Sequence, residues 1–237
     1  MTLCRHPSLR FVKVALLALL KLAGPSEVWP EQIVPAEAEF KIRTGRAPFP
    51  SVDDLIDRPT KIETNLSSWR VGGNHIIRSE TDYHAVFPVT IEKVLSVLLD
   101  YEGTREVYGF VRESVVIEAS PMPFDLHVVR LAVGFSVLGF GEKYVYVTNN
   151  WIEEDDRGGY TQTYTLAESV DDKLYAILGN WYIEPIVYEG APYTYVRQYA
   201  IIGVQRGSRS IELAMRVFGG RSLRQNFRQL SAKTKGS

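Results

Sequence analysis

The feature that most constrains the fold is a series of strand-like segments separated by turn-forming residues. Six of them follow one another, at residues 111–118, 126–135, 142–152, 160–166, 174–183 and 194–204. The stretches between them are short and rich in Gly, Pro and Asp, which favour turns. Parallel neighbours need a crossover of a dozen or more residues, so connections this short predict antiparallel neighbours in one sheet.

One more strand and two short helices are expected before this series. Charged and apolar residues alternate over residues 77–87, which indicates a strand with one buried face. Pro88 ends that strand, and Thr90 can cap a helix whose apolar side chains recur every three or four residues. A second helical turn is predicted over residues 104–109.

A long helix is expected at the end of the chain, over residues 210–233. Its apolar stripe follows steps of three and four residues and includes Leu213 and Val217. The complete order predicts an α+β fold, in which a curved antiparallel sheet of seven strands wraps around the C-terminal helix. A sheet bent in this way is not easily filled by its own side chains, so a cavity between sheet and helix is expected.

The N-terminal residues have the composition of a secretory signal peptide. Arg5, Arg10 and Lys13 precede a run of seven apolar residues, and a basic head before a short apolar stretch is typical of such peptides. The run is too short to cross a bilayer, which takes about 20 apolar residues. Residues 1–26 are therefore predicted to be a signal peptide, and the mature chain to be periplasmic or secreted. A membrane anchor or an uncleaved hydrophobic tail is the alternative.

Residues 27–70 are predicted to be a Pro-rich tether. Five prolines interrupt this segment, and no stretch of it keeps a helical period for long. It is expected either to be disordered or to lie over the surface of the folded domain. The ligand-binding domain is then expected at residues 71–237.

The composition excludes several classes of protein. The chain has 237 residues, 45% of them hydrophobic and 23% charged, with a net charge of −1, which excludes a disordered or collagen-like chain. A single Cys excludes a disulfide framework and zinc sites with several thiolates. The near-neutral charge argues against a nucleic-acid partner. Motifs of nucleophilic, phosphate-binding or metal sites are absent from the sequence, so neither a cofactor nor a metal is expected.

Five phrases mark the order of these elements. They are FPVTIEKV (87–94), LDY (99–101), FVRES (110–114), GNWYIEP (179–185) and TYVRQY (194–199). Together with the terminal helix, they resemble the helix-grip superfamily of START-like lipid-transfer domains, polyketide cyclases and dehydratases, and birch-pollen-allergen-like proteins. The resemblance covers residues 71–233 and implies a deep hydrophobic cavity. It assigns no catalytic residue, because the superfamily has no universal catalytic motif.

Strand alternation and the helical stripe select the side chains expected to face the cavity. They are Tyr83, Phe87, Val129, Leu131, Val133, Phe135, Tyr146, Tyr164, Trp181, Ile183, Arg197, Tyr199, Leu213 and Val217. For the strands of Tyr146 and Tyr164, alternation leaves open which face is the inner one. The set is mostly apolar and aromatic, as ligand pockets are, although a packed core is the alternative interpretation. Arg197 could be a buried cation that meets a carboxylate or a ring oxygen, or an ordinary surface or edge-strand arginine.

Two classes of function follow from these candidates. The first is binding or transfer of a hydrophobic small molecule, such as a lipid, sterol, isoprenoid or quinone. The alternative is a cyclase- or dehydratase-like enzyme acting on a polyketide-type substrate, which would need an acid–base pair directed into the cavity. A third alternative is an interaction domain with a filled cavity. The apolar, aromatic candidates favour the binding protein.

The charge of the chain is uneven. Residues 205–237 hold eight basic residues and one acidic residue, a balance of +7. Arg221, Arg224 and Arg228 share one face of the predicted helix. That face is expected either to dock on an anionic membrane surface or to be solvated and paired with nearby acids.

Overall fold

Strands make up most of the protein in the computed structural model, which describes residues 43, 45–47, 50–57, 60–120, 126–137 and 140–236. The helices are α2 (Val52–Asp57), α3 (Ile91–Leu98), α4 (Thr104–Val107) and α5 (Arg209–Gly236). The strands are β1 (Thr60–Val71), β2 (Asn74–Phe87), β3 (Val111–Ser120), β4 (Leu126–Val137), β5 (Phe140–Glu154), β6 (Tyr160–Ser169), β7 (Leu174–Tyr188) and β8 (Ala191–Gly207).

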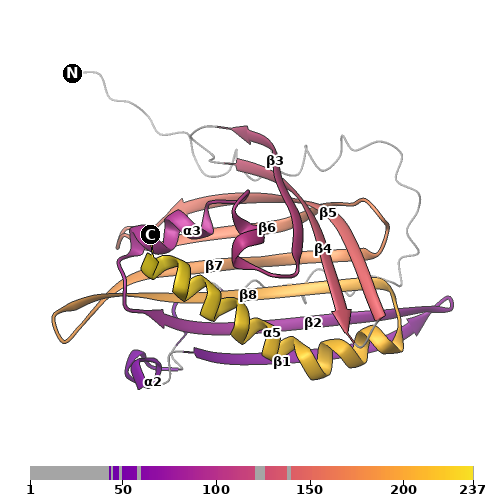
Figure 1. The fold of residues 1–237 in the computed structure, drawn as a ribbon, viewed down its shortest axis with the longest axis horizontal. Coiled ribbons are helices and arrows are strands. Elements are labelled where there is room, and N and C mark those ends of the chain that lie inside the picture. Colours follow the sequence, from indigo (N-terminus) through magenta and orange to yellow (C-terminus); the bar gives the residue numbers. More distant parts are fainter. Residues whose placement is uncertain are drawn as a thin grey trace. The chain divides into compact units, whose positions relative to one another are not determined.

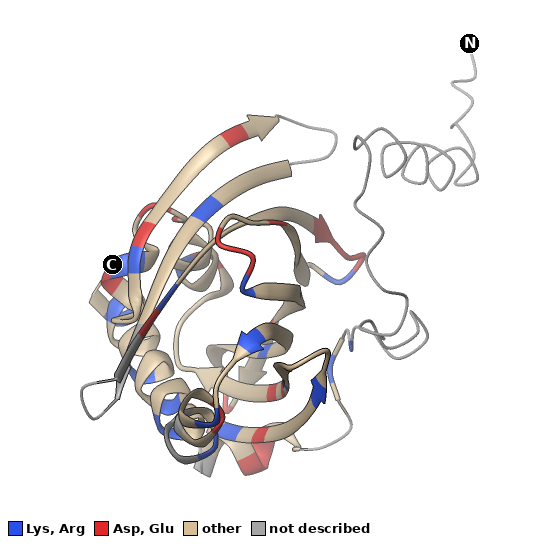
Figure 2. Cartoon of the chain, turned by 90° about the vertical axis from the view of Figure 1, so that its right-hand side faces the viewer, with Lys and Arg blue, Asp and Glu red and all other residues tan. Residues whose placement is uncertain are grey.

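The strands form one eight-stranded antiparallel sheet in the order β1-β2-β8-β7-β6-β5-β4-β3 (Figure 1). The predicted α+β fold, with an antiparallel sheet and a long C-terminal helix, is confirmed. The strands of Figure 2 follow a curve that α5 closes on one side. We call the face of the sheet that packs against α5 the inner face, and the opposite one the outer face.

The predicted count of seven strands is wrong, because β1 lies in the segment that was expected to be a tether. β1 pairs with β2 from end to end, and the turn between them is formed by Gly72 and Gly73, with φ angles of 54° and 86°. A type I′ hairpin turn requires positive φ at both positions, which Gly adopts without strain. β1 is an edge strand whose side chains are all exposed or half-buried, so its sequence shows no regular alternation.

The predicted domain boundary at residue 71 is therefore too late. Residues 40–237 form one compact unit, and residues 50–57 pack on the outer face of the sheet. Leu55 of α2 is 1% exposed and lies in a cluster with Val86, Tyr182 and Tyr195. The predicted signal peptide lies outside the described residues. Within the part of the chain that the structure describes, no helix is long and apolar enough to cross a membrane.

The C-terminal half of α5 supplies the core of the inner face. Phe227 and Leu230 are buried among aromatic side chains of β2 and β7, and the ring of Phe227 stacks on Tyr83. Aromatic stacking adds about 0.5–1.5 kcal/mol to the free energy gained by burial. α3 packs against the same cluster through Val94 and Leu98. These contacts hold α5 against the sheet at one end of the inner face.

Candidate functional site

A cavity of about 250 Å³ lies between the inner face of the sheet and helices α3, α4 and α5. Seven strands and all three helices contribute to its wall. Half of the lining residues carry a hydroxyl or amide group: Thr81, Tyr101, Thr104, Tyr108, Ser114, Tyr146, Thr148, Asn150, Gln162, Tyr164, Gln198 and Asn226. The other half are apolar, and none of the described lining residues is charged.

The structure places five of the predicted cavity residues on the wall. They are Val129, Leu131, Tyr146, Tyr164 and Trp181. Another group faces the same side of the sheet but is buried beside the cavity: Tyr83, Phe87 and Ile183 pack around Phe227, and Val133 is 4% exposed. For these four residues the packed-core interpretation is the right one. The side chains of Phe135 and Val217 lie outside the described part of the structure.

Three predicted cavity residues are elsewhere. Arg197 and Tyr199 of β8 contact Asp82 and Glu80 on the outer face, whereas the residues in alternation with them, Gln198 among them, line the cavity. Both faces of β8 are buried over much of its length, so its sequence does not show which face is inner. Leu213 is 62% exposed, because Ile211 and Met215 are the side chains by which the first turns of α5 pack on the sheet, and a residue two positions from each points to another side of the helix.

Apart from Tyr146 and Tyr164, the polar side chains of the wall were missing from the prediction. Gln162 shares the inner face of β6 with Tyr164, so the alternation that selected Tyr164 also points to Gln162. Tyr101 and Tyr108 come from the segment between α3 and β3, which has no period that could indicate a direction. Asn226 sits between apolar residues of α5 and is 6% exposed.

Hydrogen bonds link these polar groups across elements. Gln162 Nε2 donates to Tyr101 Oη at 3.0 Å, and Gln198 Nε2 donates to Tyr164 Oη at 3.4 Å. On β5, Asn150 Nδ2 donates to Thr148 Oγ1 at 3.0 Å. The cavity therefore has an organised polar part as well as an apolar part.

The phenols of the cavity stay protonated at neutral pH. Burial raises the pKa of Tyr164 to about 12 and raises the pKa values of Tyr108 and Tyr146 even further above the ordinary value. A neutral phenol can donate one hydrogen bond and accept others. It does not act as a base near neutral pH, because its conjugate anion is hardly populated.

The position of Tyr164 depends on a glycine in the neighbouring strand. Tyr164 lies directly opposite Gly179 in the β6–β7 ladder. A Cβ atom at residue 179 would collide with the phenol of Tyr164 and with the backbone oxygen of Tyr199. Because residue 179 is glycine, the phenol of Tyr164 can occupy the space that a side chain there would fill.

The outer face holds a buried ion pair. Arg197 donates two hydrogen bonds to Asp82, from Nε to Oδ1 at 2.8 Å and from Nη2 to Oδ2 at 2.7 Å. His84 Nε2 lies 3.1 Å from Asp82 Oδ1, and its Nδ1 lies 2.9 Å from Tyr195 Oη. A carboxylate only accepts, so Nε2 carries a proton; in the neutral imidazole Nδ1 then accepts from Tyr195 Oη.

Residues 43, 45 and 46 lie beside this ion pair. Arg197 Nη1 donates to the backbone oxygen of Gly45 at 3.0 Å. Arg43 Nη1 lies 3.3 Å from Asp82 Oδ2, and Arg46 Nε donates to Glu184 at 2.9 Å. The predicted buried cation at Arg197 therefore exists, but its partners are a carboxylate and the N-terminal segment, on the side away from the cavity.

Searches for related proteins gave likenesses in structure only. Neither a family model nor a curated protein matches the sequence. The STAR-related lipid transfer protein of Xanthomonas axonopodis is 12% identical, with a TM-score of 0.51, over 72% of this chain and 98% of that one. Human StAR-related lipid transfer protein 5 is 12% identical, with a TM-score of 0.50, over 72% of this chain and 86% of that one.

A third solved structure has a lower score. The Zhui aromatase/cyclase of Streptomyces sp. R1128 is 12% identical, with a TM-score of 0.48, over 67% of this chain and 94% of that one. Identities this low establish the fold alone. The chain has the START-like fold, an antiparallel sheet closed by a long C-terminal helix.

Proposed function

We propose that this protein binds a hydrophobic small molecule, of the lipid, sterol, isoprenoid or quinone class, in the cavity between the sheet and α5. The observation that carries the proposal is the cavity itself, with Trp181 and Phe227 among the large apolar side chains of its wall. Its volume of about 250 Å³ is just under the ~300–1,000 Å³ that ligand pockets usually have. A compact ligand is therefore favoured.

The enzyme alternative has less support. A cyclase or dehydratase needs an acid and a base that reach the substrate. Among the described residues of the wall there is neither a carboxylate, a histidine, a lysine nor a cysteine, and burial raises the pKa values of Tyr108, Tyr146 and Tyr164. Binding without chemistry is the function that this wall suits best.

A neutral fluorophore tests the binding proposal. N-phenyl-1-naphthylamine should show a saturable rise in fluorescence and should raise the melting temperature of the protein. A ligand at 100 times its Kd stabilises a protein by about 2.7 kcal/mol. Ala200 lines the cavity, so Ala200→Phe should fill it and abolish the fluorescence change. Ala191→Phe, at an exposed position of the same strand, is the matched control. Equal binding by both variants would contradict the proposal.

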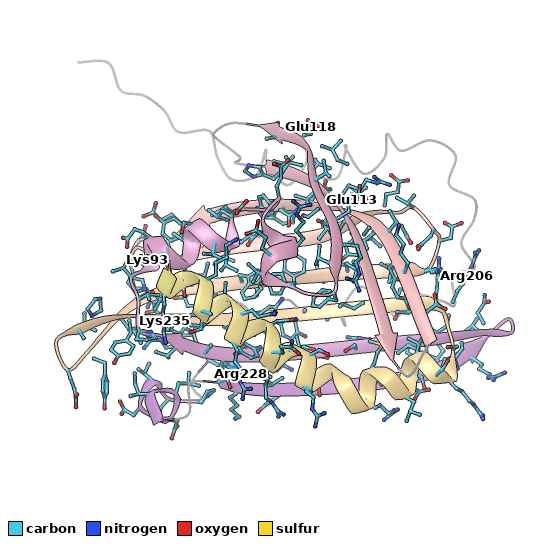
Figure 3. The ribbon with its side chains drawn as sticks, in the orientation of Figure 1. Lys93, Glu113, Glu118, Arg206, Arg228 and Lys235 are labelled. Atoms are coloured by element: carbon cyan, nitrogen blue, oxygen red, sulfur yellow. The ribbon has the colours of Figure 1, made fainter. Side chains whose placement is uncertain are left out.

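The partner that we propose for ligand exchange is an anionic membrane surface. Arg221, Arg224 and Arg228 are exposed, and the structure gives them no ion pair with a described carboxylate. Lys233, by contrast, pairs with Glu106 at 2.9 Å. Figure 3 shows Arg228 and Lys235 on α5. Each basic residue close to an anionic membrane contributes about 1 kcal/mol.

Vesicle sedimentation tests this docking. Binding should require anionic phospholipid, weaken with salt, and fall when the three arginines are replaced by Gln. The control carries the same change at three exposed arginines outside α5: Arg70, Arg105 and Arg157. Equal loss in both variants would leave only a general charge effect.

Export after removal of residues 1–26 is part of the same proposal, and the intact mass of protein from its native host would test it.

A further inference from the structure

We infer that the ligand of this cavity is uncharged and carries a hydroxyl group, which Gln162 and Tyr108 bind. The inference rests on the proposed function, because it names the class of molecule that the same cavity accepts. It is carried by two buried polar atoms of the wall to which the described part of the structure gives no hydrogen-bond partner.

The first of these atoms is Gln162 Oε1. Gln162 is 4% exposed, and its side chain lines the cavity. Its amide nitrogen already donates to Tyr101 Oη at 3.0 Å, whereas Oε1 is buried without a partner among the described residues. Buried polar groups are usually satisfied, since an unmade hydrogen bond there is costly. The Gln162 amide thus offers an acceptor to a molecule in the cavity.

The second atom is Tyr108 Oη. It is also buried without a partner among the described residues, and Tyr108 lines the same cavity. Tyr108 directly follows α4, and Gln162 lies on β6 and is bonded to Tyr101 in the loop before α4. The two partners of the proposed hydroxyl therefore come from the segment 101–108 and from β6. A phenol donates its proton and accepts through its oxygen, whereas an amide oxygen only accepts. A ligand hydroxyl can donate to Gln162 and accept from Tyr108 at the same time.

The rest of the wall excludes a charged head group. None of its described residues carries a charge, and burying an unpaired carboxylate, phosphate or ammonium group is strongly unfavourable. The buried charges of the outer face, Asp82 and Arg197, are already paired with each other. A pure hydrocarbon would leave Gln162 and Tyr108 unsatisfied. Alcohols and phenols are the class that meets both conditions.

Three molecules with one ring system test the inference: 2-naphthol, naphthalene and 2-naphthoate at neutral pH. Each competes with N-phenyl-1-naphthylamine in the full chain. We expect 2-naphthol to displace the fluorophore at a concentration about 10-fold or more below that of either other compound, since only 2-naphthol satisfies the polar atoms without introducing a charge.

Two variants locate the effect. Gln162→Met and Tyr108→Phe remove the polar atoms with little change in volume, so naphthalene should still bind while the preference for 2-naphthol falls to about 3-fold or less. The matched controls are Gln229→Met and Tyr175→Phe. Gln229 and Tyr175 also have a buried polar atom without a described partner, but neither lines the cavity. Both controls should keep the full preference, and thermal melts should show that all four variants fold.

The outcomes separate this inference from the proposed function. Equal displacement by the three compounds, or tighter binding of 2-naphthoate, would overturn the inference and leave hydrophobic binding intact. A preference that survives in Gln162→Met and Tyr108→Phe would overturn the assignment of these residues. Failure of the fluorophore and all three compounds to bind would instead remove the proposed function.

Discussion

The two faces of the sheet bury polar side chains in opposite ways. On β8, Arg197 points to the outer face and Gln198 to the inner one. Outside, the guanidinium donates two hydrogen bonds to Asp82 and one to the backbone of Gly45. Inside, the amides and phenols are uncharged, and two of them, on Gln162 and Tyr108, keep a polar atom without a described partner. The buried charges of the outer face are thus paired within the protein, whereas the described residues around the cavity of the inner face are uncharged and suited to receive another molecule.

This difference has energetic consequences that can be separated by mutation. A buried ion pair contributes little relative to a well-packed apolar pair, but removing one partner leaves an uncompensated charge. Removal of a polar group that faces the cavity should cost less stability, because such a group has not made all of its hydrogen bonds within the protein. Outer-face substitutions should therefore act on stability, and inner-face substitutions mainly on binding.

The largest effect is expected from breaking the outer ion pair. Arg197→Met leaves the buried Asp82 carboxylate without its main partner, so the free energy of unfolding should fall by about 3–5 kcal/mol. The double variant Asp82→Leu/Arg197→Met removes both charges and should recover most of that loss. Urea unfolding of wild type and both variants measures this. A loss below about 1 kcal/mol in the single variant would mean that the two faces do not differ in this way.

A smaller loss is expected where the inner face is crowded. Gly179→Ala brings a methyl group against the phenol of Tyr164 and the backbone oxygen of Tyr199. Overpacking of this kind costs about 1–3 kcal/mol, and displacement of Tyr164 should also weaken fluorophore binding. Gly190→Ala is a poor control because φ is 76° there. Gly109→Ala, with open space around the added carbon, is better. Unchanged binding in Gly179→Ala would show that Tyr164 does not shape the cavity.

The two faces should differ in how their stability depends on pH: the outer face should lose stability in acid and the inner face in alkali. Burial by itself would raise the pKa of Asp82, but the hydrogen bonds from Arg197 and His84 outweigh it and hold the pKa well below its ordinary value. A carboxylate of this kind stabilises the fold fully above its unfolded-state pKa of about 4, and that stabilisation is lost as the pH falls further. The wild type should therefore lose more stability in acid than Asp82→Leu/Arg197→Met.

The inner face should respond to alkali instead. Burial raises the pKa of Tyr164 to about 12. A phenol with a raised pKa stabilises the fold below its unfolded-state pKa of about 10, and this contribution is lost as the pH rises through the folded-state value. Tyr164→Phe should reduce the alkaline loss and leave the acid branch unchanged. Thermal melts from about pH 2 to pH 11 give both branches, and identical curves for all three proteins would contradict the assignment.

The smallest effect is expected at the rim of the outer network. Arg46 is bonded to Glu184 at 2.9 Å, but its side chain is 39% exposed. Exposed ion pairs contribute about 0.2–1 kcal/mol, so Arg46→Gln should hardly change global stability. It should make residues 43–57 easier to cleave by protease, because local opening precedes cleavage. A stability loss as large as that of Arg197→Met would mean that exposed and buried ion pairs of this face contribute alike.

Local sequence pattern was sufficient for the types and order of most elements. All six strand segments of 111–204 and the long terminal helix are present, because turn residues and side-chain periodicity act within a few residues of the chain. The edge strand β1 was missed for the same reason. Its backbone is hydrogen-bonded to a neighbouring strand on one side only, and none of its side chains is fully buried, so no periodicity marks the strand.

The sequence by itself also indicated aromatic side chains for the inner wall. Strand alternation selected Trp181, but it left open which face of β5 and β6, and so of Tyr146 and Tyr164, would be the inner one. The tertiary structure alone decided which face of β8 meets the cavity, because both of its faces are buried by elements distant in sequence. It alone brought Gln162 of β6 to Tyr101 of the loop before α4, 61 residues apart. Strand alternation shows which side chains share a face of the sheet, but only the packing of whole elements decides whether that face lines the cavity.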